Sequence, residues 1–287
     1  MAPNVCGLGR ITPYEAWLRY VYPESRTVEE TEAMEFGQEL EDPIARVAAR
    51  RWGFRIRRSL KTLHHPEHPW MVANIDREVI GLPAVLECKN RGFWQGRRYG
   101  DDFSEEVQPD EFIQAQHYLA VTGKQVCYLA VLIGGQMLRR FELRRDDAAI
   151  EKIIRIEEHF WKLVKAKTPP PPQTHADCAS LWPEVAADVA TVNEAQAEVV
   201  AQLVEVKKEI ARLEEERERL DVRVKMLIGE KEGIVLAGEE RPIATWKHNR
   251  PRKVFHQDAF AQAHPDLFEQ FCTMLPGERV LRTRSTE

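Results

Sequence analysis

The segment Ala73–Asn90, ANIDREVIGLPAVLECKN, reads as two strands around a tight turn, yet it carries Asp76, Glu87 and Lys89 within strand sequence. If the turn is centred on the Gly81–Leu82 bond, Asp76 lies directly opposite Glu87, with Cβ atoms roughly 5 Å apart. Lys89 projects from the same face as Glu87, because side chains alternate along a strand. Two acids this close destabilise a sheet unless a positive charge lies between them. The hairpin therefore predicts a cation site.

No histidine or thiolate accompanies these acids, so the site offers hard oxygen ligands, which Mg²⁺ and Mn²⁺ prefer. The lysine is placed to orient a metal-bound water or to help remove its proton. Such a site predicts phosphodiester hydrolysis, because the metal polarises a phosphoryl oxygen and stabilises the leaving oxygen. The alternative is a cross-strand salt-bridge triad on an exposed face. The apolar flanks VANI and AVL disfavour it, since they indicate an interior strand pair where unpaired acids are costly.

The length and composition set limits on the class of protein. The 287 residues, 43% hydrophobic and 30% charged, suffice for one large domain or one domain with an appendage. No apolar run reaches the roughly 18 residues of a membrane span, and the start MAPNVCGLGR lacks the pattern of a signal peptide. We therefore expect a cytoplasmic protein outside membranes. The five scattered cysteines form no CxxC pair, which indicates reduced thiols rather than disulfides or a zinc site.

The first part of the chain has helical patterns. Residues 14–54 read as helical, and Thr12 is the N-cap candidate of the first helix. A second helix is expected to stop at Gly53, and Pro43 predicts a kink or break near Asp42.

Residues 54–145 read as strands interrupted by one helix. FRIRRSL alternates, WMVANID and AVLECKN form the hairpin, and QVCYLAVLIGGQMLRRFEL predicts two strands around a two-residue Gly-Gly turn. QPDEFIQAQHYLAVTG predicts an amphipathic helix with Gly123 as its stop. This order favours an α/β core, with a mixed sheet flanked by helices. A further helix, DDAAIEKIIRIEEHFWKLVKAK, ends at the proline run 169–172.

The proline run predicts two domains, a core over residues 1–172 and a linked helical extension with a basic lobe over residues 173–287. Apolar residues in the extension follow steps of three and four that predict a coiled-coil-like helix. It would pack within its own domain or associate with a second copy. The residues are Val199, Leu203, Val206, Ile210, Leu213, Leu220, Val224 and Leu227.

The net charge of −5 is unevenly distributed along the chain. Residues 51–100 hold ten lysines and arginines against four acids, and residues 241–257 hold five against none. Such stripes matter more to a polyanion than the overall charge does, although each could also be an ordinary solubilising surface.

The D-x10-E-x-K pattern on a hairpin resembles the PD-(D/E)xK nuclease superfamily, which has a restriction-endonuclease-like core. Together with FGQELEDPI, FIQAQHYLAVTG, YLAVLIGG and EEHFWKLVKAKTPP, in that order, it resembles the YqaJ-type viral recombinases, the family that includes lambda exonuclease. The resemblance covers roughly residues 12–170.

The resemblance implies a role for each matching position at the metal. Asp76 and Glu87 match the metal-binding carboxylates, and the backbone carbonyl of Cys88 matches a further ligand. Glu41, in GQELEDP, matches the acid that contributes to a second metal or orders its waters. One or two Mg²⁺ ions are implied, with Mn²⁺ as a possible substitute.

It also implies the catalytic residues. Lys89 matches the lysine that activates the attacking water, and Gln114 matches the glutamine that supports this lysine and the nucleophile. Gln116 and His117 lie one helical step away and could support the same group. From the residues alone, a Gln-x-Gln on a helix is more typical of a solvated face.

The activity implied by the resemblance is metal-dependent 5′→3′ exonucleolytic digestion of linear duplex DNA, which leaves 3′ overhangs for a single-strand-annealing partner. A ring-shaped homotrimer around the DNA is also implied. The basic stripes would contact phosphates, and the loop RGFWQGRRYG would hold a wedge at the terminal base pair, unless its aromatic residues pack instead. The candidate DNA-binding residues are Arg10, Arg91, Phe93, Trp94, Arg97, Arg98, Lys247, Arg250, Arg252 and Lys253.

One departure from the family pattern concerns the 5′ phosphate. Family members usually begin with a helix whose arginine and serine help to bind it, whereas this chain starts almost inside the following segment. Either the start is truncated, or the pocket is built differently, with Arg10 as the candidate replacement. Two other functions stay open from the sequence: a PD-(D/E)xK endonuclease of restriction or repair type, and a non-catalytic DNA-binding assembly subunit.

Overall fold

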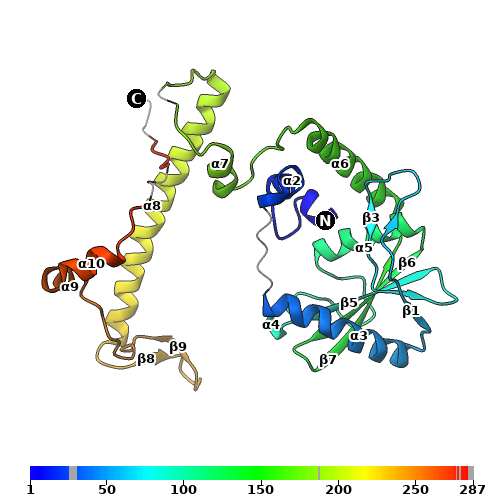
Figure 1. Ribbon diagram of the computed structural model, residues 1–287. Coiled ribbons are helices and arrows are strands. Elements are labelled where there is room, and N and C mark those ends of the chain that lie inside the picture. Colours follow the sequence, from blue (N-terminus) through cyan, green and yellow to red (C-terminus); the bar gives the residue numbers. More distant parts are fainter. Residues whose placement is uncertain (26–30, 187, 276, 278, 284–287) are drawn as a thin grey trace. The chain divides into compact units, whose positions relative to one another are not determined.

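The computed structural model describes residues 1–25, 31–186, 188–275, 277 and 279–283. It divides into two compact units, unit 1 over Met1–Val185 and unit 2 over Ala186–Glu287 (Figure 1). The predicted boundary after Pro172 falls within unit 1, because α7 (His175–Leu181) is tied to the start of the chain. The buried Asp177 accepts a hydrogen bond from Thr12 Oγ1 at 2.9 Å.

A five-stranded mixed sheet forms the centre of unit 1. Its strand order is β1-β4-β5-β6-β7, in which β5 and β6 run parallel and the other neighbours run antiparallel. The chain crosses from β5 to β6 through helices, as a parallel pair requires. The strands are β1 (Ile56–Arg58), β4 (Arg77–Val79), β5 (Ala84–Arg91), β6 (Val126–Ile133) and β7 (Met137–Arg144).

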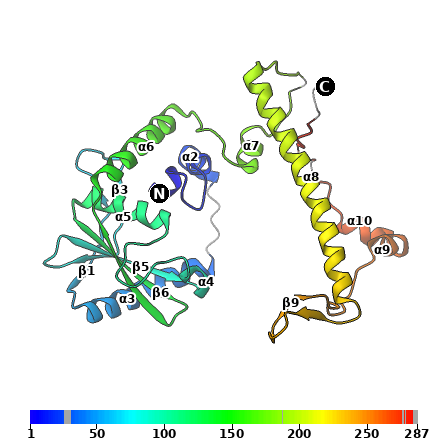
Figure 2. The ribbon, with the colours of Figure 1, turned by 180° about the vertical axis from the view of Figure 1, so that it is seen from behind.

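Helices cover both faces of this sheet (Figures 1 and 2). On one face, Ile44 and Ala48 of α3 pack against Leu86 of β5. On the other, Leu119 of α5 packs against strand residues that include Phe141. The helices of unit 1 are α1 (Ala2–Val5), α2 (Pro13–Val21), η1 (Pro23–Ser25), α3 (Glu32–Trp52), α4 (Phe93–Gly96), α5 (Pro109–Thr122), α6 (Asp147–Ala166) and α7.

The register of the central hairpin is the predicted one. Arg77 pairs with Leu86 and Val79 with Ala84, so the turn is centred between residues 81 and 82 and position 76 faces position 87. The predicted strand WMVANID is wrong, because the hairpin strand β4 begins after it, at Arg77, and within WMVANID only β3 (Val72–Ala73) is a strand. It pairs instead with β2 (Leu63–His64) in a separate two-stranded sheet.

Two local predictions are corrected by the structure. The sequence predicted a kink or a break near Asp42, and the break is wrong because helix α3 is continuous through Pro43. The buried arginine Arg77 binds Glu41 and Asp42, the last turn before the proline, and burial of the following turns holds the helix together. The β6–β7 connection is one residue longer than a two-residue turn, because Ile133 pairs with Met137. The other predicted helices of unit 1 are confirmed, except that residues 26–30 lie outside the described residues.

Unit 2 is built on one long helix. Helix α8 (Glu194–Ile228) begins at the capping residue Asn193 and carries the predicted apolar steps on an exposed surface. The unit also contains β8 (Gly233–Val235), β9 (Pro242–Thr245), α9 (Gln257–Ala263) and α10 (Pro265–Phe271). Within the described part of the chain, we find no helix with the length and apolar character needed to cross a bilayer.

Gln116 joins the central helix α5 to the junction between β7 and α6. Its side chain is fully buried; it donates to the Arg144 carbonyl at 2.7 Å and accepts from the Asp146 amide at 2.9 Å. We expect Gln116→Leu to lower the free energy of unfolding by about 2 to 4 kcal/mol, because two buried backbone groups lose their partners. Urea unfolding measures this. Gln136→Leu, at an exposed position, is the control, and equal effects of both substitutions would contradict the assignment.

Candidate active site

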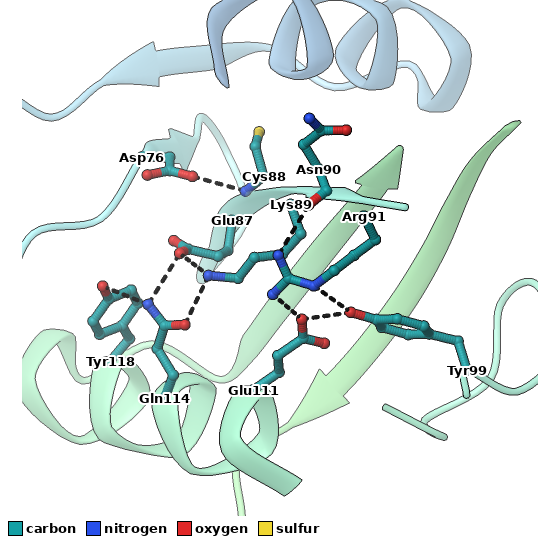
Figure 3. Close-up of polar contacts among 10 residues, drawn as sticks. All are labelled: Asp76, Glu87, Cys88, Lys89, Asn90, Arg91, Tyr99, Glu111, Gln114 and Tyr118. Atoms are coloured by element: carbon teal, nitrogen blue, oxygen red, sulfur yellow. Dashed lines mark hydrogen bonds and ion pairs between the residues drawn. The ribbon is translucent and has the colours of Figure 1, made fainter. Parts of the chain in front are cut away.

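Strand alternation divides the residues of β5 between the two covered faces. Val85 and Glu87 face α5, and Lys89 follows on that side, whereas Leu86 and Cys88 face α3. Asp76 lies just before β4, and its Oδ2 accepts a hydrogen bond from the Cys88 amide at 2.7 Å (Figure 3). The two predicted acids therefore come together on the α5 side of the hairpin.

Three side chains close a hydrogen-bonded triangle beside these acids (Figure 3). The Lys89 ammonium donates to Glu87 Oε1 and to Gln114 Oε1, both at 2.8 Å. The Gln114 amide nitrogen donates back to Glu87 Oε1 at 3.1 Å and to the Tyr118 hydroxyl at 2.9 Å. The structure thus brings the four predicted catalytic residues together, and adds Tyr118 to them.

The charges in this cluster do not balance. Burial, followed by the charge of Glu87, raises the pKa of Asp76 to about 8. Burial alone would lower the pKa of Lys89, but attraction to Glu87 outweighs it and raises that pKa above its usual value. One ammonium therefore faces two carboxylates, and the second carboxylate needs either a proton or a further cation.

The donor set fits a divalent cation. Glu87 is 7% exposed, and its Oε2 is buried without a hydrogen-bond partner among the described residues. This oxygen, the Asp76 carboxylate and the Cys88 carbonyl are hard donors suited to Mg²⁺ or Mn²⁺. Within the described ranges, no group of three or more histidine, cysteine, aspartate or glutamate side chains could hold a metal. A cation here would depend on two carboxylates and backbone or water oxygens.

Glu41 is linked to the site by an arginine that the sequence analysis missed. Arg77 is 2% exposed and donates through Nη1 to Glu41 Oε1 and to the Asp76 carbonyl, both at 2.6 Å. The charge of Glu41 also contributes to the raised pKa of Asp76. Arg77 therefore fixes α3 next to the acid pair. Its sequence signal is weak, because Arg77 shares the short strand β4 with a second charged residue, Glu78.

A second missed network holds the end of β5. Glu111 of α5 is buried; its Oε1 accepts from Arg91 Nη2 at 2.6 Å and from the Tyr99 hydroxyl at 2.5 Å. Arg91 Nε donates to the Tyr99 hydroxyl at 3.1 Å. The predicted DNA-binding charge of Arg91 is thus already balanced by Glu111 (Figure 3).

The other predicted DNA-binding residues of unit 1 lie near this network. Arg10 and Arg98 line a cavity of about 200 Å³ together with Arg91 and Glu111. Phe93 and Trp94 are 57% and 74% exposed, so they do not pack into the core. The Arg97 guanidinium lies 5.5 Å from the centre of the Trp94 ring. Lys247, Arg250, Arg252 and Lys253 belong to unit 2 and are exposed.

Gln116 and His117 do not support the catalytic group. The amide of Gln116 binds the backbone at Arg144 and Asp146, as described above. His117 places Nδ1 at 2.8 Å from Glu157 and Nε2 at 3.0 Å from the Val72 carbonyl. Both side chains therefore hold the helix in place.

The mixed sheet flanked by helices and the acid-rich hairpin define a restriction-endonuclease-like fold. The crystal structure of an alkaline exonuclease, LHK-Exo, from Laribacter hongkongensis has this fold, with a TM-score of 0.50 and 20% sequence identity. The match covers 58% of this chain and 86% of that one.

Residues 2–125 match the YqaJ-like viral recombinase domain. A protein of Bacillus subtilis (strain 168), named "Uncharacterized protein YqaJ", is 38% identical over 152 residues, which are 52% of this chain. The chain spans about half of that relative, 47% of its length. The resemblance found in the sequence is confirmed: the part of the chain that is similar to a YqaJ-like viral recombinase domain includes the whole hairpin and Gln114.

The raised pKa of Asp76 predicts a pH-dependent stability. Because its pKa in the folded state lies above its value in the unfolded chain, ionisation of Asp76 weakens folding as the pH rises from about 4 to about 8. With a chelator at pH 8, we expect Asp76→Asn to raise the free energy of unfolding by about 1 to 3 kcal/mol, with little change at pH 4. Urea unfolding at both pH values tests this, with the exposed Asp101→Asn as control. Destabilisation at pH 8 would contradict it.

The unpartnered oxygen of Glu87 predicts stabilisation by divalent cations. We expect Mg²⁺ or Mn²⁺ to raise the unfolding temperature, increasingly with concentration, since a ligand of the folded state stabilises it. Glu87→Gln should abolish this increase. Glu78→Gln is the matched control on the same hairpin, because Glu78 pairs with Arg57 instead. An equal increase in the Glu87 variant, measured by calorimetry, would place the cation elsewhere.

Proposed function

We propose that this chain is a metal-dependent exodeoxyribonuclease that degrades linear double-stranded DNA in the 5′→3′ direction. It would leave 3′ single-stranded overhangs for recombination by strand annealing. The observation that carries this proposal is the convergence of Asp76, Glu87, Lys89 and Gln114 within a YqaJ-like domain. The fold it shares with an alkaline exonuclease agrees with the proposal.

In this proposal, Asp76, Glu87 and the Cys88 carbonyl hold the cation, and Glu41 orders the surroundings of a second ion. When bound, the metal would polarise the scissile phosphate and lower the pKa of the attacking water. Lys89 is charged at neutral pH because its pKa is raised, so its ammonium acts as a hydrogen-bond donor. It would orient the water and balance the charge that develops on the phosphate. Gln114 keeps the lysine next to Glu87.

The residues at and near the cavity lined by Arg10 and Arg98 suit the end of a DNA strand. Arg10 and Arg98 would bind the 5′ phosphate, since Arg91 is already paired with Glu111. The exposed rings of Phe93 and Trp94 would lie against the terminal base pair. We further propose that the protein forms a ring-shaped homotrimer around DNA and works with a single-strand-annealing protein.

Digestion of end-labelled linear duplexes tests the activity. We expect degradation in Mg²⁺ or Mn²⁺ and none in chelator, with loss of the 5′ label first and a higher rate when the 5′ end is phosphorylated. Lys89→Ala should lower the rate by about 100-fold or more while DNA binding is kept. Lys152→Ala, an exposed lysine on α6, is the control.

A covalently closed circular duplex separates the proposed exonuclease from an endonuclease. An enzyme that needs an end leaves the circle intact in Mg²⁺, so nicked or linear products would show endonuclease activity instead. If Lys89→Ala and Glu87→Gln both digest linear DNA at the original rate, the hairpin does not perform the hydrolysis.

A further inference from the structure

The connection between β9 and α9 in unit 2 contains a row of exposed cationic and aromatic residues. The segment from Trp246 to His256, named here the basic loop, has no helix or strand, and all its residues are exposed. Residues 241–257 contain five lysines and arginines and no acid. The charges of this segment are therefore accessible to a ligand.

Two aromatic side chains lie near the ends of the basic loop. Trp246 is fixed by its backbone, which donates to the Glu232 carbonyl at 3.0 Å, yet its side chain is 53% exposed. The Lys225 ammonium of α8 lies 5.8 Å from the centre of the Trp246 ring. Phe255 is 69% exposed and touches Phe260 at 5.1 Å between ring centres. Both rings therefore leave much of their surface to solvent.

The cations between these rings are largely unpaired. Lys247 forms an ion pair with Glu232 at 2.6 Å. Among the described residues, no ion-pair partner is found for Arg250, Arg252 or Lys253. Three free positive charges within four positions, next to exposed rings, favour an anionic ligand that also has flat apolar surfaces.

We infer that the basic loop binds single-stranded DNA, as a site on unit 2 separate from the hairpin of unit 1. Unpaired bases offer faces that can stack on Trp246 and Phe255, whereas the bases of a duplex are already stacked on each other. The arginines and the lysine match successive phosphates of an extended strand. An anionic lipid surface is disfavoured, because the loop is not an amphipathic helix with an apolar face to insert. The choice of DNA as the strand rests on the proposed function, whose product is a single strand.

Binding of fluorescently labelled oligothymidylate to the full chain tests the site. The measurement uses Glu87→Gln protein in chelator, so that no digestion occurs. We expect the triple substitution Arg250→Ala, Arg252→Ala and Lys253→Ala to weaken binding at least 10-fold. Each phosphate contact to a single strand releases roughly 0.7 of a counterion. Loss of three such contacts should therefore make the slope of log K against log salt shallower by about 2. Trp246→Ala should weaken binding about 5-fold or more.

The matched control is the triple substitution Lys208→Ala, Arg212→Ala and Arg219→Ala on α8, which removes the same charge from the same unit. Less than a 2-fold change is expected from it, and circular dichroism of every variant should show unchanged helix content. Equal losses in both triple variants, or no loss in the loop variant, would overturn the inference. So would equally tight, equally loop-dependent binding of a duplex, or loop-dependent binding of phosphatidylglycerol vesicles without binding of the oligonucleotide.

The same variants separate this inference from the proposed function. With Lys89 and Glu87 intact, loss of the initial rate at which the loop variant digests a short linear duplex in Mg²⁺ would place the loop at the duplex and contradict a separate single-strand site. If the unmodified chain digests no DNA but its oligonucleotide binding depends on the loop, the nuclease proposal fails and the loop site stands. If the chain digests DNA but its oligonucleotide binding does not depend on the loop, the loop site fails and the nuclease proposal stands.

Discussion

The opposition of Asp76 and Glu87 across a buried strand pair is the constraint on which unit 1 depends. Two carboxylates in this position repel each other and lose their solvation, and the single Lys89 ammonium compensates only one of them. A hydrophobic pair at these positions would make a more stable sheet. The fold therefore keeps an electrostatic cost in its centre, and a cation bound between the two acids would offset that cost.

Polar clamps on both faces of the sheet keep this pair in place. Arg77 reaches α3 on one face and holds Glu41, whereas Gln114 reaches back from α5 on the other face and holds Glu87 and Lys89. One turn before Gln114 on α5, Glu111 binds Arg91 at the end of β5. Each clamp joins a helix to the hairpin by a hydrogen bond to a charged group, which is shorter and stronger than a hydrogen bond between neutral groups. The acids therefore remain at a fixed distance although they repel each other.

The acidic hairpin could be predicted because its information is local. The alternation of side chains and the position of the turn together determine which residues share a face, and the observed register of Arg77 with Leu86 confirms that reasoning. The clamps could not be predicted in this way. Arg77 and Glu41 are 36 positions apart, and a charged residue in a strand carries no sign of its partner. The resemblance to a family supplied Gln114, for which the residues alone favoured a solvated position.

The errors have the same physical origin. Pro43 was expected to kink or break α3, but the helix continues through it because contacts made by residues before and after it outweigh its local cost. The strand WMVANID was expected to be continuous, but Val72 pairs with His64, and its carbonyl is bound by His117. In both places, tertiary contacts override a local preference.

The two units differ in the burial of their charged and apolar side chains, and this difference affects the stability of α8. Charged side chains of unit 1 near the hairpin are buried and paired, whereas α8 has its charges and its apolar steps in solvent. A 35-residue helix without burial gains little beyond propensity and local ion pairs such as Arg212 with Glu209. Ile228 is its only buried residue in the described structure. Covering the apolar steps from Val199 to Leu227 would therefore stabilise this helix. The sequence alone favoured packing within the domain, whereas the observed exposure of these steps favours self-association of α8.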